Sequence, residues 1–145
     1  MDLFQTIDVA SSGMVAQRAR LNIIATNLAN ANTTKTQDGT PYRRKTVIFQ
    51  TTPMGRSFDN HLQNALEQEI QGVDVSGIMP VPGDFKRVFD PGHPDADAKG
   101  YVYLPNVNLV EEMVHMLNAN RSFEANSAVI KAAKVMAKRA LEIGR

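Results

Sequence analysis

The segment from Asp90 to Asp97 holds the residue types of this sequence that are best suited to chemistry. Four ionisable side chains, Asp90, His93, Asp95 and Asp97, stand close together there, and carboxylates beside an imidazole can ligate a metal ion or act as an acid–base pair. The segment also contains two prolines and a glycine, and aspartates in such surroundings commonly accept hydrogen bonds from the backbone of a turn. Its spacing departs from the Asp-x-Asp-x-Asp-Gly pattern of an EF-hand calcium loop. The turn formers favour a rigid structural turn, and the alternative is the active site of an enzyme such as a cell-wall hydrolase.

Composition excludes several other classes of function. The 145-residue chain has no cysteine, which excludes a disulfide scaffold and a thiolate metal site. Its net charge is +1 and its one tight basic run is Arg43-Arg44-Lys45, which we interpret as a solvated strand end rather than a nucleic-acid site. The N-terminus lacks a basic region followed by an apolar core, so we expect no cleaved secretory signal. No apolar run reaches membrane-spanning length. We therefore expect no cofactor, no nucleic-acid partner and no direct membrane insertion.

The distribution of helix breakers predicts the fold class. All seven prolines lie between positions 41 and 105, and seven of the nine glycines lie between positions 39 and 100. Such dense punctuation suits short strands and turns and is incompatible with long helices. The sequence predicts an α+β fold, mainly α, in which long terminal helices pair antiparallel around a small β-hairpin-rich middle domain. The expected parts are an N-terminal helix within 1–33, a middle domain over 34–106 and a C-terminal helix within 107–145.

A long helix is predicted from Asn108 to Ile143. Asn108 and Glu111 have the spacing of a capping box, and at about 1.5 Å per residue the helix would reach roughly 50 Å. Its apolar residues recur at alternating steps of four and three, which is typical of a helix that packs against other helices. The first row is Leu109, Met113, Met116, Phe123, Ile130, Ala137 and Leu141, and a second row of Val110, Val114 and Leu117 widens the stripe. Such a helix is longer than a compact domain of this size can cover, and we therefore expect other protein chains to pack against it.

The N-terminal residues repeat this pattern. Apolar side chains again step by four and three through Leu3, Ile7, Ala10, Met14, Leu21, Ile24, Leu28 and Ala31. The small residues from Ala10 to Gly13 interrupt the helix formers, because glycine costs about 1 kcal/mol relative to alanine in a helix interior. Two interpretations stay open for this cluster: a local weak point or kink, and a close approach by the backbone of another helix.

Four asparagines near the end of this helix also need an explanation. Asn30 and Asn32 suit a helix end, where asparagine tolerates the left-handed conformation. Asn22 and Asn27 lie in the helix interior, where the amide competes for backbone hydrogen bonds. They either face solvent or are buried amides that fix the register between packed helices, and we favour the buried role.

The middle of the chain is expected to form short strands and one short helix. Strand formers dominate the latter part of 41–50, and 72–79 alternates apolar and polar residues. A possible short amphipathic helix covers 59–71. The strand at 72–79 is expected to pair as a hairpin with 85–89, and a strand at 100–105 leads into the C-terminal helix.

Several stretches carry a resemblance to a known family. Near the N-terminus they are Ala10-Ser-Ser-Gly-Met-Val-Ala-Gln17 and Ala25-Thr-Asn-Leu-Ala-Asn-Ala-Asn-Thr-Thr34. Near the C-terminus they are Asn106-Val-Asn-Leu-Val-Glu-Glu-Met-Val114 and Asn120-Arg-Ser-Phe-Glu-Ala-Asn126. Together they resemble the axial proteins of the bacterial flagellum, the family of rod and hook subunits. The middle segments 38–45 and 90–97 narrow the resemblance to a subunit of the proximal rod.

The resemblance implies a structural subunit rather than an enzyme. In such a family the terminal helices line a tubular drive shaft that transmits torque and surrounds an export channel, and the middle forms a β-rich outer domain. The implied partners are other copies of the chain, the other rod proteins, and the basal-body rings or the export gate at the base of the rod. The implied route is the flagellar type III apparatus, without a cleaved signal, to the rod in the periplasmic space. A free helical adaptor protein is the remaining alternative.

Under this interpretation the apolar stripes and the helix asparagines pack subunits together. The predicted packing residues are Leu3, Ile7, Met14, Leu21, Asn22, Ile24, Asn27, Leu28, Asn30, Val110, Met113, Val114, Met116, Leu117, Phe123, Ile130 and Leu141.

Overall fold

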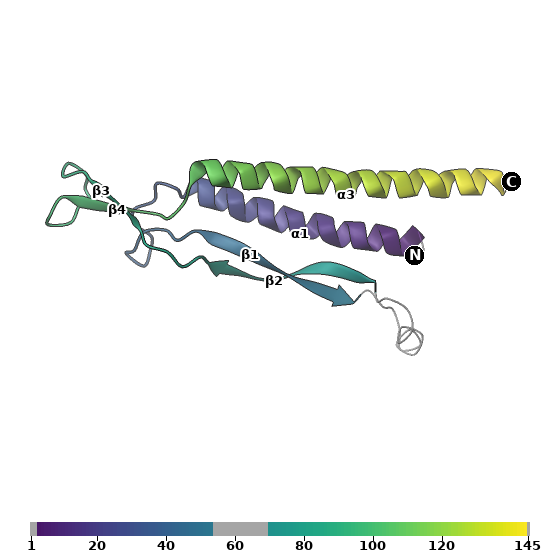
Figure 1. Cartoon of the computed structure of the whole chain (residues 1–145), viewed down its shortest axis with the longest axis horizontal. Coiled ribbons are helices and arrows are strands. Elements are labelled where there is room, and N and C mark those ends of the chain that lie inside the picture. The colour runs from purple at the N-terminus through teal and green to yellow at the C-terminus, as the bar shows by residue number, and fades with distance from the viewer. Residues whose placement is uncertain (1–2, 54–69, 145) are drawn as a thin grey trace.

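Two long helices dominate the molecule. The computed structural model describes residues 3–53 and 70–144 of the chain. Helix α1 (Leu3–Ala29) and helix α3 (Leu109–Ile143) lie side by side and run in opposite directions (Figure 1). With 35 residues against 27, α3 is about 50 Å long and α1 about 40 Å. The C-terminal end of α3 therefore extends past the N-terminal end of α1 (Figure 1).

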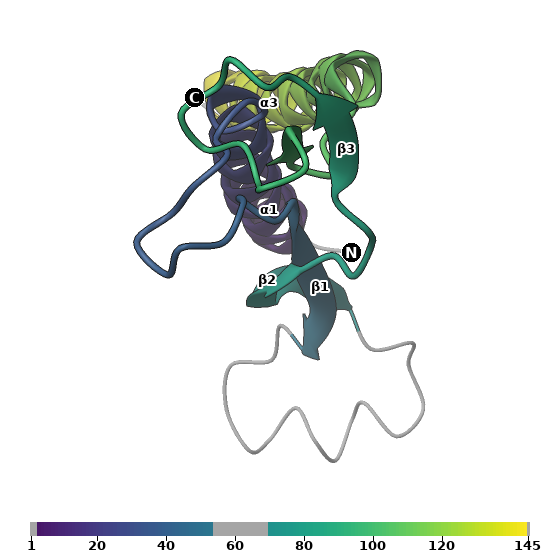
Figure 2. The ribbon, with the colours of Figure 1, turned by 90° about the vertical axis from the view of Figure 1, so that its left-hand side faces the viewer.

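Four short strands complete the fold. Strands β1 (Lys45–Pro53) and β2 (Gln71–Pro80) form one antiparallel pair, and β3 (Lys86–Phe89) and β4 (Tyr101–Leu104) form another. The β1–β2 ribbon lies along the side of α1 that faces away from α3, which gives three layers when the molecule is viewed along its length (Figure 2). The β3–β4 pair lies beyond the end of the helix pair at which α3 begins (Figure 1). The helix pair and the strand pairs confirm the predicted fold class.

Helix α3 begins at the predicted residue because Asn108 caps it. The side-chain oxygen of Asn108 accepts a hydrogen bond from the Val110 N–H at 3.1 Å, which satisfies one of the free donors of the first turn. Glu111 and Glu112 occupy that turn, where the helix dipole favours negative charge. The cap bond is made to Val110, and not to the position of Glu111 as a capping box would require.

The buried apolar residues of the two helices are mostly alanines. They are Ala10, Ala16 and Ile24 in α1 and Ala119 and Ala133 in α3. Among the described helices and strands, α3 packs against α1 alone, so Ala119 and Ala133 face α1. Small side chains at a helix contact allow the two helix axes to approach closely. We call this contact the alanine seam.

Gly13 explains the cluster of small residues in α1. A Cβ atom added at Gly13 would lie 2.7 Å from the Nδ2 atom of Asn126 on α3, which is closer than real Cβ contacts allow. Helix α1 is continuous through this position. Gly13 is therefore a site of close approach, but the approaching group is a side chain of the other helix and not the backbone that the sequence interpretation expects.

The predicted hairpin between 72–79 and 85–89 is wrong. Strand β2 pairs instead with β1, from Lys45 opposite Pro80 to Pro53 opposite Gln71. Strand β3 pairs with β4, where the Phe89 and Tyr101 rings make an edge contact with centroids 5.2 Å apart. Each pair joins two consecutive strands across a long connection, whereas the prediction joined β2 to β3 across the short connection between Pro80 and Lys86. The predicted short helix over 59–71 falls almost entirely outside the described residues.

Candidate functional site

Three of the four ionisable residues from Asp90 to Asp97 accept hydrogen bonds from backbone N–H groups in the turn that joins β3 to β4, and the fourth accepts one from a side chain. The Asp97 Oδ1 atom accepts hydrogen bonds from the N–H groups of Lys99 at 2.8 Å and Tyr101 at 2.9 Å. These bonds, the one from Tyr101 first, lower the pKa of the exposed Asp97 carboxyl. The Asp90 Oδ1 atom accepts from the Gly92 N–H at 3.2 Å. Such contacts are those of Asx-turns.

The other two members of this group are occupied in the same way. The His93 Nδ1 atom accepts a hydrogen bond from the Asp95 N–H at 3.1 Å. The Asp95 Oδ2 atom accepts from the Thr34 hydroxyl at 2.7 Å, which ties the turn to the segment that follows α1. Within residues 3–53 and 70–144, no three His, Cys, Asp or Glu side chains gather closely enough to hold a metal ion. The contacts of the segment are those of the rigid turn that its turn formers favour.

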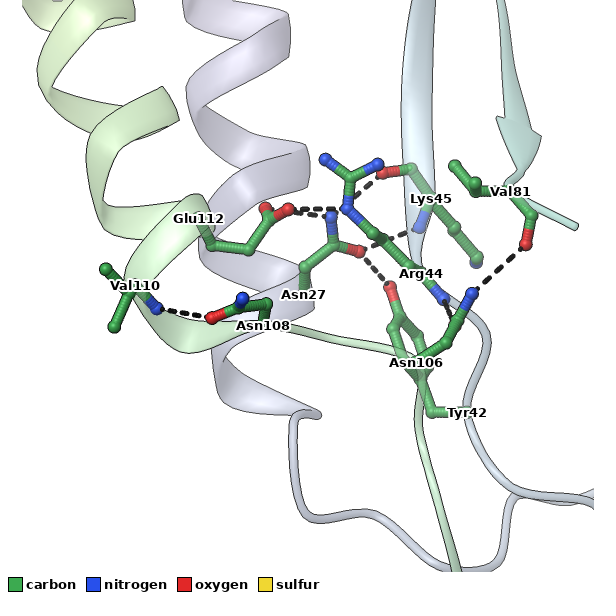
Figure 3. Close-up of polar contacts among 9 residues, drawn as sticks. All are labelled: Asn27, Tyr42, Arg44, Lys45, Val81, Asn106, Asn108, Val110 and Glu112. Atoms are coloured by element: carbon green, nitrogen blue, oxygen red, sulfur yellow. Dashed lines mark hydrogen bonds and ion pairs between the residues drawn. The ribbon is translucent and has the colours of Figure 1, made fainter. Parts of the chain in front are cut away.

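A buried polar cluster joins the two helices to the first strand (Figure 3). We call it the junction cluster and define it as Asn27, Tyr42, Arg44, Lys45 and Glu112. Asn27, at the C-terminal end of α1, is only 1% exposed. Its Nδ2 atom donates to the Lys45 carbonyl at 2.9 Å and to Glu112 at 3.1 Å. Its Oδ1 atom accepts from the Tyr42 hydroxyl and from the Lys45 N–H, each at 2.9 Å. The amide thus uses all four of its hydrogen-bonding positions.

Glu112 is the charged member of the cluster that is entirely removed from solvent. Its side chain is 0% exposed, and its Oε1 atom lies 2.6 Å from the Nε atom of Arg44, whose side chain is 23% exposed. Its Oε2 atom accepts the hydrogen bond from Asn27. A buried carboxylate is tolerated only when it is paired and hydrogen-bonded. Glu112 meets both conditions through residues that are far away in the sequence.

Asn106 connects the cluster to Val81, the residue that follows β2. Its Oδ1 atom accepts from the Arg44 N–H at 3.1 Å, and its Nδ2 atom donates to the Val81 carbonyl at 3.4 Å. The Val81 N–H in turn donates to the Arg44 carbonyl at 2.7 Å. The start of β1, the end of β2 and the approach to α3 are therefore joined at one place.

Tyr42 provides a test of the cluster through pH. Burial, and after it the nearby Glu112 carboxylate, raise the pKa of Tyr42 above its ordinary value of 10.0. We expect Tyr42→Phe to lower the free energy of unfolding by about 1 kcal/mol at pH 8, because Asn27 loses one hydrogen bond. Since the folded pKa is the higher one, this stabilisation is complete below pH 10 and is lost as pH rises through the folded pKa. Urea unfolding should therefore show the difference between the two proteins shrinking above pH 10.

Tyr103→Phe is the matched control, because Tyr103 is 41% exposed. Equal effects of the two substitutions at pH 8 would contradict a role for the Tyr42 hydroxyl.

The predicted packing residues fall into three groups in the structure. Ile24 and Asn27 are buried; Leu3, Ile7, Met14, Leu21, Leu28, Asn30, Met116, Phe123 and Ile130 are half-buried; Asn22, Val110, Met113, Val114, Leu117 and Leu141 are exposed. The fold of one chain therefore uses the first group fully and leaves the third uncovered.

Four of the exposed residues form a continuous apolar surface, which we call the outer row. Val110, Met113, Val114 and Leu117 are 64%, 55%, 52% and 52% exposed. Because a helix has 3.6 residues per turn, they fall on the side of α3 roughly opposite Glu112, which is buried at α1. Contiguous exposed apolar surface of this kind marks an interaction site.

No helix within the described residues is both long and apolar enough to cross a lipid bilayer.

Sequence reasoning identifies only Asn27 among the members of the junction cluster. It interprets Arg44 and Lys45 as part of a solvated strand end, and it does not expect Tyr42 or Glu112 to be buried hydrogen-bonding partners. One signal is available for Glu112, which stands four residues before Met116 and seven before Ala119. A charge at that spacing lies on the buried face of the helix and requires a partner.

Known proteins match this chain along its whole length. A family model described as flagella basal body rod protein matches residues 7–35, and the model of the flagellar basal body rod FlgEFG protein C-terminal region matches residues 98–143. The flagellar basal-body rod protein FlgC of Borreliella burgdorferi is 47% identical over 152 aligned residues, which cover 99% of this chain and 98% of the relative. The FlgC proteins of Bacillus subtilis and Salmonella typhimurium are each 40% identical over the full length of both chains. The two matched segments contain α3 and all of α1 from residue 7 onward, which are the helices that meet in the junction cluster.

Proposed function

The chain belongs to the FlgC family of flagellar basal-body rod proteins, and we propose that its terminal helices assemble it into the wall of a tubular proximal rod. It is a structural component of the rod and not an enzyme. In this proposal the tube transmits torque and surrounds part of the export channel. The chain reaches the periplasmic space through the flagellar type III apparatus without a cleaved signal.

The outer row is the observation that carries this proposal. One face of α3 is covered by α1, while Val110, Met113, Val114 and Leu117 on the other side are all more than half exposed. Helix α3 is apolar on two sides, and its own chain covers only one of them. Helices of neighbouring subunits would cover the second side.

The elongated shape supports an open assembly over a closed one. Two different surfaces, one on each side of the helix pair, would make heterologous contacts, and such contacts that do not close generate a helical array. The helices within 1–33 and 107–145 would form the tube-lining part, and 34–106 the outer part. The partners would be other copies of this chain, the other rod proteins, and the basal-body rings or export gate at the base of the rod.

The test is a charge placed in the outer row. Leu117→Asp is expected to leave the isolated chain folded, because Leu117 is 52% exposed, and to abolish incorporation into rods, because an unpaired carboxylate would be buried between subunits. Swimming motility and the amount of the chain in purified basal bodies measure the effect. Both should fall at least tenfold.

Asn118→Asp places the same charge on the exposed surface of α3 beside the outer row and should retain motility. Motile cells with normal basal bodies carrying Leu117→Asp would overturn the assignment of the outer row to the subunit interface.

A further inference from the structure

The alanine seam leaves the register of the helix pair weakly specified. Alanine side chains are short and interlock little, so the contacts of the alanine seam distinguish only weakly between one register and the next. Apart from α1, none of the described helices and strands packs against α3, so the strands do not hold α3 in place directly. Something other than apolar packing must select one register.

We propose that Glu112, together with Arg44 and Asn27, is the positioning element that selects the register of α3 against α1. The Glu112 carboxylate is 0% exposed, and its partners are the Arg44 Nε atom at 2.6 Å and the Asn27 Nδ2 atom at 3.1 Å. Asn27 is itself held by both backbone groups of Lys45. The carboxylate therefore has a fixed receptor, built by α1 and the segment that leads into β1.

A shift by one turn removes this receptor. In the observed register Glu112 lies at the level of Asn27. A slip of three or four residues toward the N-terminus of α1 brings the carboxylate to the level of Ile24 or Ile23, whose side chains offer no hydrogen-bond donor. A slip the other way brings it past the end of α1 to Asn30, whose Nδ2 atom already donates to the Thr26 carbonyl. A buried and unpaired carboxylate is strongly unfavourable. The slipped register is disfavoured by the charge, while the alanines are indifferent to it.

A second contact agrees with the same register. Asn126 meets α1 at Gly13, and Gly13 and Asn27 are as far apart on α1 as Glu112 and Asn126 are on α3, fourteen residues in each case. For antiparallel helices, equal spacings mean that both contacts form together in one alignment. After a slip of four residues, Asn126 would stand at the level of Val9, where a branched side chain replaces the glycine.

A buried polar group can fix the register of packed helices at a cost in stability, as a single core asparagine does in a coiled coil. The same relation makes the proposal testable here. Replacing both charged partners with apolar side chains of similar size should cost less stability than removing Glu112 alone, and it should lose the single register. If these residues only stabilised the fold, the same replacement would lower the stability and leave the single register unchanged.

The experiment uses the full chain, which has no native cysteine. Spin labels are attached to cysteines introduced at the exposed positions Arg18 on α1 and Ala128 on α3, and the distance between them is measured by pulsed electron resonance. The otherwise unchanged chain should give one narrow distance. Arg44→Met with Glu112→Leu should give a second population, displaced by about 5 Å along the axis for a slip of one turn, with a thermal midpoint above that of the chain carrying Glu112→Ala alone.

The matched control is Arg43→Met with Glu111→Leu, which makes the same chemical changes one residue away at exposed positions and should keep the single distance. A single unchanged distance in the Arg44→Met, Glu112→Leu chain would overturn the proposal, whatever its thermal midpoint.

If that chain does not fold, the same distance measurement is made on Glu112→Gln. This variant keeps the size of the side chain and should still show the second population, and an unchanged distance in it overturns the proposal. The result does not depend on rod assembly, so it is separate from the test of the outer row.

Discussion

Replacing Glu112 alone with alanine should lower the free energy of unfolding by about 3 kcal/mol, the low end of the cost of removing one partner from a buried ion pair. The substitution leaves the guanidinium of Arg44, only 23% exposed, without its carboxylate. It also leaves one N–H of Asn27 without an acceptor in a site that is 1% exposed. Urea unfolding followed by circular dichroism measures the change.

Glu111→Ala is the control for this substitution. Glu111 is the preceding residue in the same helical turn, and it is exposed. Its removal should cost less than about 1 kcal/mol, the contribution of a favourable charge at a helix N-terminus. Equal losses for the two variants would show that helix-end charge, and not the junction cluster, accounts for the role of Glu112.

Asn27→Asp should have a comparable effect through a change of a single atom. The introduced carboxylate cannot donate to the Lys45 carbonyl or to Glu112, so two hydrogen bonds of 2.9 and 3.1 Å are lost. It also stands beside the Glu112 carboxylate, and two like charges in one buried site oppose each other. Each buried acceptor left without its donor costs about 1–3 kcal/mol. We therefore expect a loss of at least about 3 kcal/mol at pH 7.

The pH dependence separates this effect from a simple packing defect. Protonation of the introduced carboxyl restores a donor toward Glu112 and removes one charge, so the difference from the parent should shrink as the pH falls below 7. Asn22→Asp is the control, because Asn22 is exposed on the same helix, and its effect should stay within about 0.5 kcal/mol. A loss for Asn27→Asp that does not change with pH would argue against charge repulsion in the cluster.

The two helices could be predicted from the sequence because their signals are local. Asn108 caps α3 where its residue type and position suggest, and the stepping of apolar residues is visible within each segment. One of the two interior asparagines is buried as expected: Asn27 is, whereas Asn22 is exposed. Periodicity cannot separate the two, because what distinguishes Asn27 is the backbone of Lys45, which belongs to a different element.

The face of α3 is less well predicted, for a geometric reason. A row with a period of 3.5 residues drifts by about 20° per heptad around a straight helix. The predicted row is half-buried at Phe123 and Ile130, but near the start of the helix it has turned outward, and Leu109 and Met113 are 50% and 55% exposed. Glu112 occupies the buried side there instead.

The strand pairing and the junction cluster could not be predicted from one sequence. Arg44 and Glu112 are separated by 68 residues, and no local pattern connects them. The pairing of β1 with β2 spans a longer connection than the one between β2 and β3, so a rule that prefers the shortest connection chooses the wrong partner for β2. Contacts of this kind become visible only when the chain has folded.

The alanine seam has a mechanical consequence for a shaft under load. Long side chains between two helices can bend and rotate, and they absorb part of any displacement before it reaches the next backbone. At Ala119 and Ala133, which are 1% and 0% exposed, there is almost no side chain to deform, and close-packed interiors have low compressibility and transmit strain. A force that presses α3 against α1 is therefore transmitted nearly backbone to backbone. A wall built from such pairs would be thin and stiff, and little of an applied twist would be lost as elastic give inside each subunit.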